Sequence, residues 1–169
     1  VTNGAQSGLA SMAYAMSVLR SGQENAMLAT GSDENSDIMT ELFGKLGVTS
    51  EKVVAPFAGN DGFVLSDGSA SVLIEDEEAA KERGARIYCH VTGYGMAHSN
   101  VKFGPLTGSE AGLTNAVKNA LADAGMTIDD IDAVFGFANG MKAVDDVEIK
   151  GLTAVFGDKL AEKPVVELK

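Results

Sequence analysis

The sequence predicts an α/β fold, because segments with a helical pattern and segments with a strand pattern alternate along the chain. Apolar residues recur at helical spacing in several segments, and short apolar runs that end near glycine stand between them. A content of 45% hydrophobic and 22% charged residues is ordinary for a soluble globular domain. The length of 169 residues is sufficient to bury a core.

The first half of the chain is expected to hold helices and strands in alternation. Leu9, Met12 and Met16 recur at helical spacing, and Gly22 ends the helix that they predict. Two apolar runs flank the pair Asp67-Gly68, which predicts a β-hairpin. The expected elements are a helix over 7–20, a strand over 25–30, a helix over 37–46, strands over 63–65 and 70–75, and a helix over 77–83.

The second half has a clearly bounded helix at its start. Ser109 is the expected N-cap and Gly125 the expected C-cap, and Leu113 and Leu121 belong to the buried stripe between them. The expected elements are a strand over 87–94, a helix over 110–124, a strand over 131–135, a helix over 145–156 and a strand over 164–168.

The charge balance restricts the partners. A net charge of −11 provides no basic stripe for nucleic acid and disfavours anionic membrane surfaces. The chain has one cysteine, which excludes an internal disulfide and fits a reducing, cytoplasmic compartment. No apolar run approaches the roughly 20 residues of a membrane span. We therefore expect neither nucleic acid nor membrane as a partner.

Most residues of chemical interest stand in ordinary structural positions. Cys89 lies within a predicted strand, away from the helix N-terminus that would lower its pKa, so we interpret it as a core residue. His90 and His98 lack further ligands at metal-binding spacing, so neither a metal nor a cofactor is expected. The acids at 145–148 open a helix, whose dipole favours each of them by about 0.3–1 kcal/mol. The Gly-Tyr-Gly run at 93–95 is too short to indicate a phosphate loop.

Two turns have the form of a catalytic site without its chemistry. Residues 3–9 run from a small-residue turn into a helix, where an enzyme would place a nucleophile, but the apex is Ala5. Residues 135–141 run from a strand into a glycine-containing turn that carries the apolar Phe137. Together the two turns indicate the scaffold of an enzyme from which the reactive side chains are missing.

Several runs together resemble the β-ketoacyl-[acyl carrier protein] synthases. Residues 61–70 with 72–75 are similar to the D-G-F-V-x-G-E-G-A hairpin of that family and its L-x-L-E continuation. Residues 81–88 resemble its A-x-x-R-G-A-x-I-Y passage, and residues 93–95 its V-x-G-Y-G run. Residues 145–157 resemble its D-A-V-E-I-K helix and the segment that follows. The resemblance covers nearly the whole chain.

The resemblance implies where the catalytic residues of the family would stand. The family cysteine, in T-A-C-A-S-G-L, falls on Ala5, and the first histidine, in H-G-T-G-T, falls on Phe137. The family lysine falls on Lys169, and the helix acids on Asp145 and Glu148. A methyl group cannot form a thioester, and a phenyl ring cannot stabilise an oxyanion. No catalytic set is therefore intact.

The resemblance also implies a fold and partners. The family has a thiolase-like α-β-α-β-α architecture built from two halves. Residues 1–84 would be the end of the N-terminal synthase half, and residues 85–169 the start of the C-terminal half. The missing strands would leave apolar faces and sheet edges open, so we expect the remaining pieces of the same subunit as further partners.

The function implied is that of a chain-length factor, a non-catalytic subunit that pairs with an active synthase. Such factors often have glutamine at the cysteine position, and here Gln6 stands one place later. The partners would be a catalytic synthase or a second copy, and an acyl carrier protein. The alternative is an active acyltransferase, decarboxylase or hydrolase of the family that uses Asp145, Glu148 and Lys169, so whether the chain is an enzyme stays open. A third possibility is a scaffold without an acyl pocket.

Overall fold

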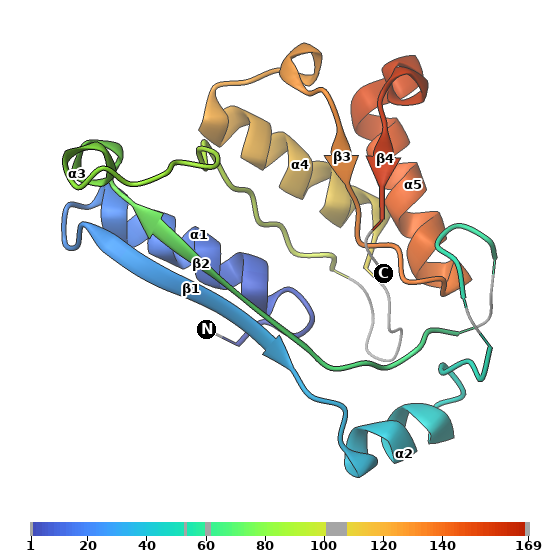
Figure 1. Ribbon diagram of the computed structural model, residues 1–169. Coiled ribbons are helices and arrows are strands. Elements are labelled where there is room, and N and C mark those ends of the chain that lie inside the picture. The colour runs from blue at the N-terminus through green and yellow to red at the C-terminus, as the bar shows by residue number, and fades with distance from the viewer. Residues whose placement is uncertain (1, 53, 60–61, 101–107, 168–169) are drawn as a thin grey trace. The chain divides into compact units, whose positions relative to one another are not determined.

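The chain divides into two compact units (Figure 1), and the computed structural model describes residues 2–52, 54–59, 62–100 and 108–167. Unit one comprises Val1–Ser36 and Ser66–Val91, and unit two comprises Asp37–Leu65 and Thr92–Lys169. Helices and strands alternate along the chain, as predicted for an α/β fold. None of the helices in the described ranges is both long and apolar enough to cross a membrane.

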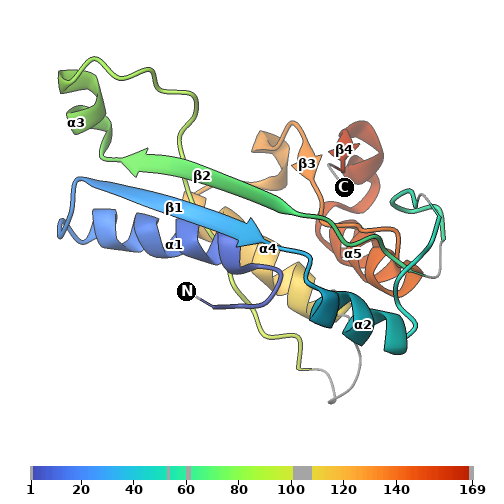
Figure 2. The ribbon, with the colours of Figure 1, turned by 60° about the horizontal axis from the view of Figure 1, so that its bottom comes forward.

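Unit one is a two-stranded antiparallel sheet with one helix along it (Figure 2). Its elements are α1 (Ser7–Arg20), β1 (Ala26–Asp33), β2 (Gly68–Glu75) and α3 (Glu77–Glu82). The two strands pair over their full length, and the hydroxyl groups of Thr30 and Ser71 are hydrogen-bonded across them at 2.8 Å. The predicted helix over 7–20 is confirmed, and β1 is longer than the predicted strand over 25–30.

Glycine allows α1 to pack closely on β1. A Cβ atom at Gly31 would lie 3.1 Å from the Cα atom of Gly8, which is tighter than ordinary van der Waals contact. Nearby, Ser11 Oγ donates a hydrogen bond of 3.3 Å to the carbonyl of Thr30. The buried apolar side chains of these two elements are Ala15, Met16 and Ala29. The helix is therefore fixed to the sheet by close backbone approach rather than by bulky side chains.

The predicted hairpin between residues 63–65 and 70–75 is wrong. β2 pairs with β1 instead, and Phe63 forms an isolated bridge with Thr49 in unit two. The physical reason is the length of the available partner. β1 offers eight residues, so β2 can form a complete ladder of hydrogen bonds with it, which a strand of three residues could not provide.

Unit two contains a parallel strand pair joined through a helix. Its elements are α2 (Asp37–Lys45), α4 (Glu110–Ala124), the 3₁₀ helix η1 (Ile128–Asp130), β3 (Val134–Phe135), α5 (Lys142–Phe156), the 3₁₀ helix η2 (Gly157–Glu162) and β4 (Val165–Val166). β3 and β4 are parallel, as a β-α-β connection requires. Both strands are shorter than predicted, and Leu168 lies outside the described residues. α5 begins before the predicted residue 145.

The predicted caps of α4 are confirmed. Ser109 Oγ accepts a hydrogen bond of 3.0 Å from the backbone N–H of Gly112, and Gly125 has the left-handed φ of 65° that ends many helices. α4 packs against α5 at a glycine, because a Cβ atom at Gly151 would lie 2.7 Å from Leu113 Cδ2. These two helices form the main contact between helices in unit two.

The predicted strand over 87–94 is wrong, since no strand is present there in the described part of the chain. Gly93 and Gly95 approach the backbone of α4 so closely that a side chain at either position would collide with it. The backbone N–H of Tyr94 donates to Asp123 Oδ2 at 3.0 Å. At residues 93–95 the chain contacts the helix α4 instead of pairing with a strand. The glycines of the Gly-Tyr-Gly run allow this close contact, because they have no side chain.

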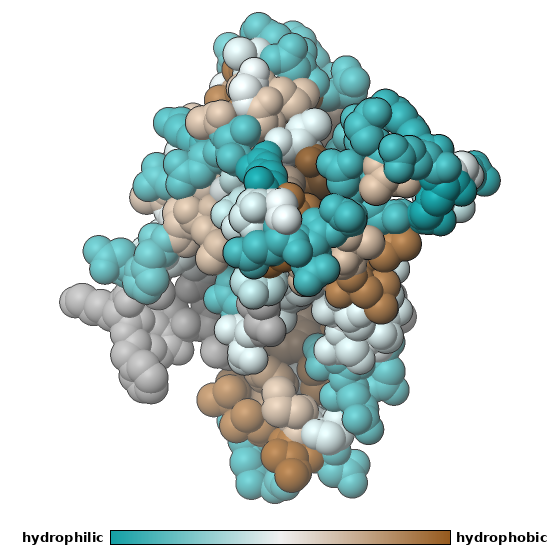
Figure 3. Space-filling model, turned by 90° about the vertical axis from the view of Figure 1, so that its left-hand side faces the viewer, coloured by the Kyte–Doolittle hydropathy of each residue, from teal (hydrophilic) through white to brown (hydrophobic). Residues whose placement is uncertain are grey.

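Hydrophobic side chains remain at the surface among hydrophilic ones (Figure 3). In unit one, Leu28 of β1 and Leu73 of β2 are directly paired and remain 66% and 53% exposed. The β1 residues that alternate with Leu28 include the buried Ala29. One face of this sheet is therefore covered and the other is open in this chain.

We expect Gly95→Ala to lower the free energy of unfolding by about 1–3 kcal/mol, because the added methyl group would meet the backbone of α4. Gly44→Ala is the matched control. Gly44 lies within α2 with open space at its Cβ position. Alanine there should raise the free energy of unfolding by up to about 1 kcal/mol, because alanine favours the helix more than glycine does. Urea unfolding of the full-length protein measures both changes. Equal effects of the two substitutions would contradict the close packing of residues 92–95 on α4.

Candidate functional site

The turn before α1 is held by a serine rather than by its apex residue. Ser7 Oγ accepts a hydrogen bond of 2.8 Å from Asn3 N–H and donates one of 2.7 Å to the carbonyl of Gly4. Gly4 has a positive φ of 59°, a conformation that favours glycine. Ala5 is exposed, and Gln6 precedes the helix without capping it through its side chain. The apex at Ala5 thus contributes only a methyl group at the N-terminus of α1.

The second turn, residues 136–141, is held by Glu148 of α5. Glu148 Oε1 accepts a hydrogen bond of 2.7 Å from Phe137 N–H, and Oε2 accepts one of 2.6 Å from Ala138 N–H. Only 8% of the residue Glu148 is exposed. Burying a carboxylate removes its hydrogen bonds with water, and the bonds from two backbone N–H groups compensate for that loss.

Asp145 continues the same arrangement toward the end of the turn. Its Oδ1 accepts from Asn139 N–H at 3.1 Å and from Gly140 N–H at 3.3 Å. Its Oδ2 accepts from Phe57 N–H at 2.7 Å, which ties a second loop to the turn. Asp145 is 3% exposed, so these partners replace its water. Every carboxylate oxygen of Asp145 and Glu148 is therefore committed to the backbone.

The sequence interpretation of these acids is only partly right. Asp145 lies in the first turn of α5, where the helix dipole favours an acid, whereas Glu148 lies beyond that turn. The hydrogen bonds of both acids go to the turn at residues 136–141 and not to the helix itself. The polar partners of the two acids are backbone N–H groups of the turn, which no pattern of side chains reveals.

A shallow pocket of about 320 Å³ lies beside the first turn of α5. Its lining residues are Phe57, Gly59, Lys142, Asp145, Asp146 and Ile149. Lys142 Nζ and Asp146 Oδ2 form an ion pair of 2.5 Å at this pocket, and the hydrogen bond from Lys142 lowers the pKa of Asp146 from its ordinary value. Phe137 and Met141 are not part of its lining.

Sequence reasoning missed Glu167, which follows β4. Both of its carboxylate oxygens are buried, and a Cβ atom added at Gly136 would collide with them. Gly136 follows β3 and immediately precedes Phe137. The sequence feature that could have drawn attention to Glu167 is an acid directly after the apolar residues Val165 and Val166 of a predicted strand. Lys169 lies outside the described residues.

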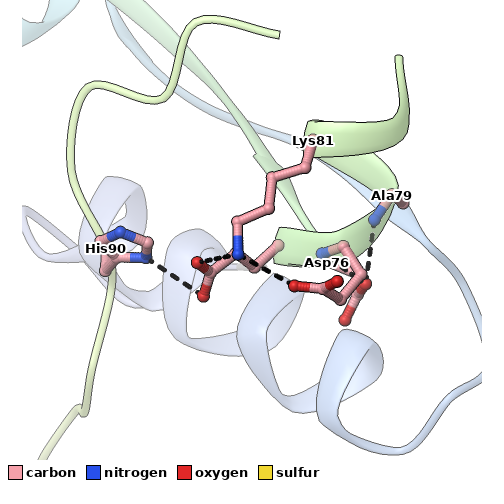
Figure 4. Close-up of polar contacts among 6 residues, drawn as sticks. Asp76, Ala79, Lys81 and His90 are labelled. Carbon is pink, nitrogen blue, oxygen red and sulfur yellow. Dashed lines mark hydrogen bonds and ion pairs between the residues drawn. The ribbon is translucent and has the colours of Figure 1, made fainter. Parts of the chain in front are cut away.

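The charged cluster around α3 is a solvated helix start (Figure 4). Asp76 caps the helix by accepting from Glu78 N–H at 3.1 Å. Lys81 Nζ lies 2.8 Å from Glu77 Oε1 and 2.9 Å from Glu78 Oε1, and His90 Nδ1 lies 3.8 Å from Glu77 Oε2. The hydrogen bond from Lys81 lowers the pKa of Glu77. Exposed pairs of this kind contribute little to stability.

The remaining candidates do not assemble into a site. Cys89 is exposed, so its interpretation as a core residue is wrong, because the segment around it is not a covered strand. His98 Nδ1 accepts a hydrogen bond of 2.8 Å from Asn100 N–H. Within the described ranges, no group of three or more His, Cys, Asp or Glu side chains could hold a metal ion.

The chain matches two family models of known proteins. "Beta-ketoacyl synthase, N-terminal domain" matches residues 2–80, and "Beta-ketoacyl synthase, C-terminal domain" matches residues 88–167. The 3-oxoacyl-[acyl-carrier-protein] synthase 2 of Coxiella burnetii is 29% identical over 159 residues, which are 89% of this chain and 38% of that protein.

Solved structures agree with these matches. The ishigamide ketosynthase/chain length factor has a TM-score of 0.84 and 30% identity, over 96% of this chain and 40% of that chain. The AntDE:AntF complex, a type II PKS acyl-carrier protein with its ketosynthase, has a TM-score of 0.91 and 25% identity, over 97% of this chain and 42% of that chain.

These matches confirm the resemblance and the thiolase-like α/β fold, of which the chain carries a part. The chain spans about two fifths of the length of the relatives named above, at 38–42%. Both family models lie in the expected order along the chain, and together they account for most of it. The chain therefore belongs to the β-ketoacyl synthase family.

Proposed function

We propose that this chain is part of a β-ketoacyl synthase homologue that lacks condensing activity and supports an active synthase, as a chain-length factor does. The observation that carries the proposal is the methyl group of Ala5 at the N-terminus of α1, on which the family cysteine falls according to the sequence resemblance. A methyl group cannot become a thiolate or hold an acyl group. The similarity to the ishigamide ketosynthase/chain length factor supports this assignment.

The second turn supports the same conclusion. The first histidine of the family falls on Phe137 according to the sequence resemblance, and a phenyl ring donates no hydrogen bond to a developing oxyanion. The backbone cannot substitute for it, because the N–H groups of Phe137 and Ala138 already donate to Glu148. Those of Asn139 and Gly140 donate to Asp145. The turn keeps its structure and has no donor left from these residues for a reacting carbonyl.

The partners follow from the same assignment. A catalytic synthase or a second copy would be the partner subunit, as for a chain-length factor. The AntDE:AntF complex contains an acyl-carrier protein, which supports an acyl carrier protein as a further partner. Phe137 and Met141 would line or fill the former acyl site. Residues 1–84 and 85–169 would belong to the two synthase halves, and the remaining parts of those halves would complete the subunit.

The alternative is an active member of the family with displaced chemistry. Such an enzyme would use Asp145, Glu148 and Lys169 as its catalytic residues. Asp145 and Glu148 do not favour it, because the backbone occupies all of their oxygens, and a general acid or base needs hydrogen-bond contact with the reacting group. Only Lys169, outside the described residues, and Glu167 would remain to carry such chemistry.

The first prediction concerns activity. The full-length protein, purified without a synthase, is expected to form no acyl-protein and no 3-oxoacyl product from acyl- and malonyl-carrier proteins, because Ala5 has no thiol. Mass spectrometry of the intact protein and of the carrier-bound products measures both. Co-expression with its synthase should yield a complex that makes product. Acyl transfer by the isolated protein would refute the proposal, and malonyl decarboxylation that is lost in Lys169→Ala would support the alternative.

The second prediction separates a structural from a catalytic role for the helix acids. Glu148→Gln should lower the free energy of unfolding by about 1–3 kcal/mol, because the amide replaces a charged acceptor and turns an N–H group toward the N–H groups of the turn. Asp146→Asn is the control, because the Asp146 side chain is 44% exposed and should change stability by about 0.5 kcal/mol or less. Urea unfolding measures both. A Glu148→Gln protein of unchanged stability would contradict the structural role.

A further inference from the structure

The chain contains two Asn-Gly pairs, Asn3-Gly4 in the turn before α1 and Asn139-Gly140 in the turn after β3. In such a pair the backbone nitrogen of the glycine can attack the side-chain amide of the asparagine, because glycine has no Cβ atom to obstruct the approach. The attack requires a glycine N–H group that can lose its proton and an asparagine side chain that can turn toward it. The structure distinguishes the two pairs on both requirements.

The pair in the second turn is held in an unreactive arrangement. Gly140 is buried, and its N–H donates to Asp145 Oδ1 at 3.3 Å. Asn139 Oδ1 accepts a hydrogen bond of 3.0 Å from Met141 N–H, which fixes the side chain of the asparagine. The attack would therefore require two hydrogen bonds to break, and one of them satisfies a buried carboxylate, whose loss of a partner is costly.

The pair in the first turn has neither restraint. Asn3 and Gly4 are both exposed. Their hydrogen bonds run through Asn3 N–H, which donates to Ser7 Oγ, and through their two backbone carbonyls. Within the described ranges, neither the N–H of Gly4 nor the side-chain amide of Asn3 is hydrogen-bonded. Both reacting groups of this pair are therefore available to each other.

We propose that Asn3 is a site of spontaneous deamidation in the folded protein and that Asn139 is not. The nitrogen of Gly4 forms a bond to Asn3 Cγ, and the side-chain nitrogen of Asn3 leaves as ammonia with the proton of the Gly4 N–H group. Water then adds to either carbonyl carbon of the resulting succinimide and opens the ring. The product is an aspartyl or an isoaspartyl residue with a new carboxylate, and no oxidant or reductant takes part.

The two products have different effects on the turn at Ala5. Ser7 Oγ bonds Asn3 N–H at 2.8 Å and the Gly4 carbonyl at 2.7 Å, so its two partners stand on either side of the modified linkage. The isoaspartyl form adds a methylene group to the backbone between these partners, so Ser7 cannot keep both hydrogen bonds in the same geometry. The aspartyl form keeps the backbone and adds a negative charge before α1, on the side that the helix dipole favours.

The experiment follows both pairs in the full-length protein, incubated folded in buffer enriched in heavy-oxygen water. Peptide mapping by mass spectrometry should show conversion of Asn3 at least about tenfold faster than that of Asn139, which must first release a hydrogen bond to a charged acceptor. The new carboxylate at position 3 should carry one oxygen from the solvent. In urea the two pairs should react at comparable rates, because unfolding removes the hydrogen bonds that protect Asn139.

Two substitutions complete the test. Asn3→Gln lengthens the side chain, so the five-membered ring cannot form, and should abolish conversion at position 3 while leaving Asn139 unchanged. Asn25→Gln is the matched control, because Asn25 is exposed but precedes alanine, and should leave conversion at Asn3 unchanged. Equal rates at Asn3 and Asn139 in the folded protein would overturn the inference, as would a folded protein in which Asn3 stays intact while both pairs react in urea.

Discussion

Two buried carboxylates of α5 hold the turn that follows β3, and the organisation of unit two around this turn depends on them. Residues 136–141 form no regular ladder beyond the strand end, so their backbone N–H groups need other acceptors. Glu148 accepts from Phe137 and Ala138, and Asp145 accepts from Asn139 and Gly140. Asp145 also reaches Phe57 and thereby fixes a loop far away in the sequence. Without these acceptors, the turn would have to bury unsatisfied donors.

Hydrogen bonds of this kind make both turns independent of the side chains at positions 5 and 137. The turn at Phe137 is stabilised by its backbone and by acids of α5, so its conformation does not require a histidine. The turn at Ala5 is likewise held by Ser7 and by the positive φ of Gly4. Neither the side chain of Ala5 nor that of Phe137 takes part in these hydrogen bonds. Substitution of these two side chains therefore leaves the hydrogen bonds that hold both turns in place.

The parts of the fold that the sequence predicted well are those with local causes. The helix over 110–124 has a serine cap, a regular apolar stripe and a terminal glycine, all within its own length. The prediction of a hairpin around Asp67-Gly68 was wrong because β2 pairs with β1, a longer strand more than thirty residues away in the sequence. The predicted strand over 87–94 is absent, and at its C-terminal end residues 93–95 contact the helix α4 rather than a strand. Pairing partners are properties of the folded chain, and local pattern does not specify them.

The pair Gly136 and Glu167 shows the same limit of prediction from local sequence patterns. Gly136 and Glu167 are separated by a helix and become neighbours only through the register of β3 and β4. In the sequence, Gly136 is one glycine of a turn, and Glu167 is one acid near the end of an apolar run. In the structure, the glycine provides the space that the carboxylate occupies. The register of two parallel strands brings these positions together, and the order of residues along the chain does not specify that register.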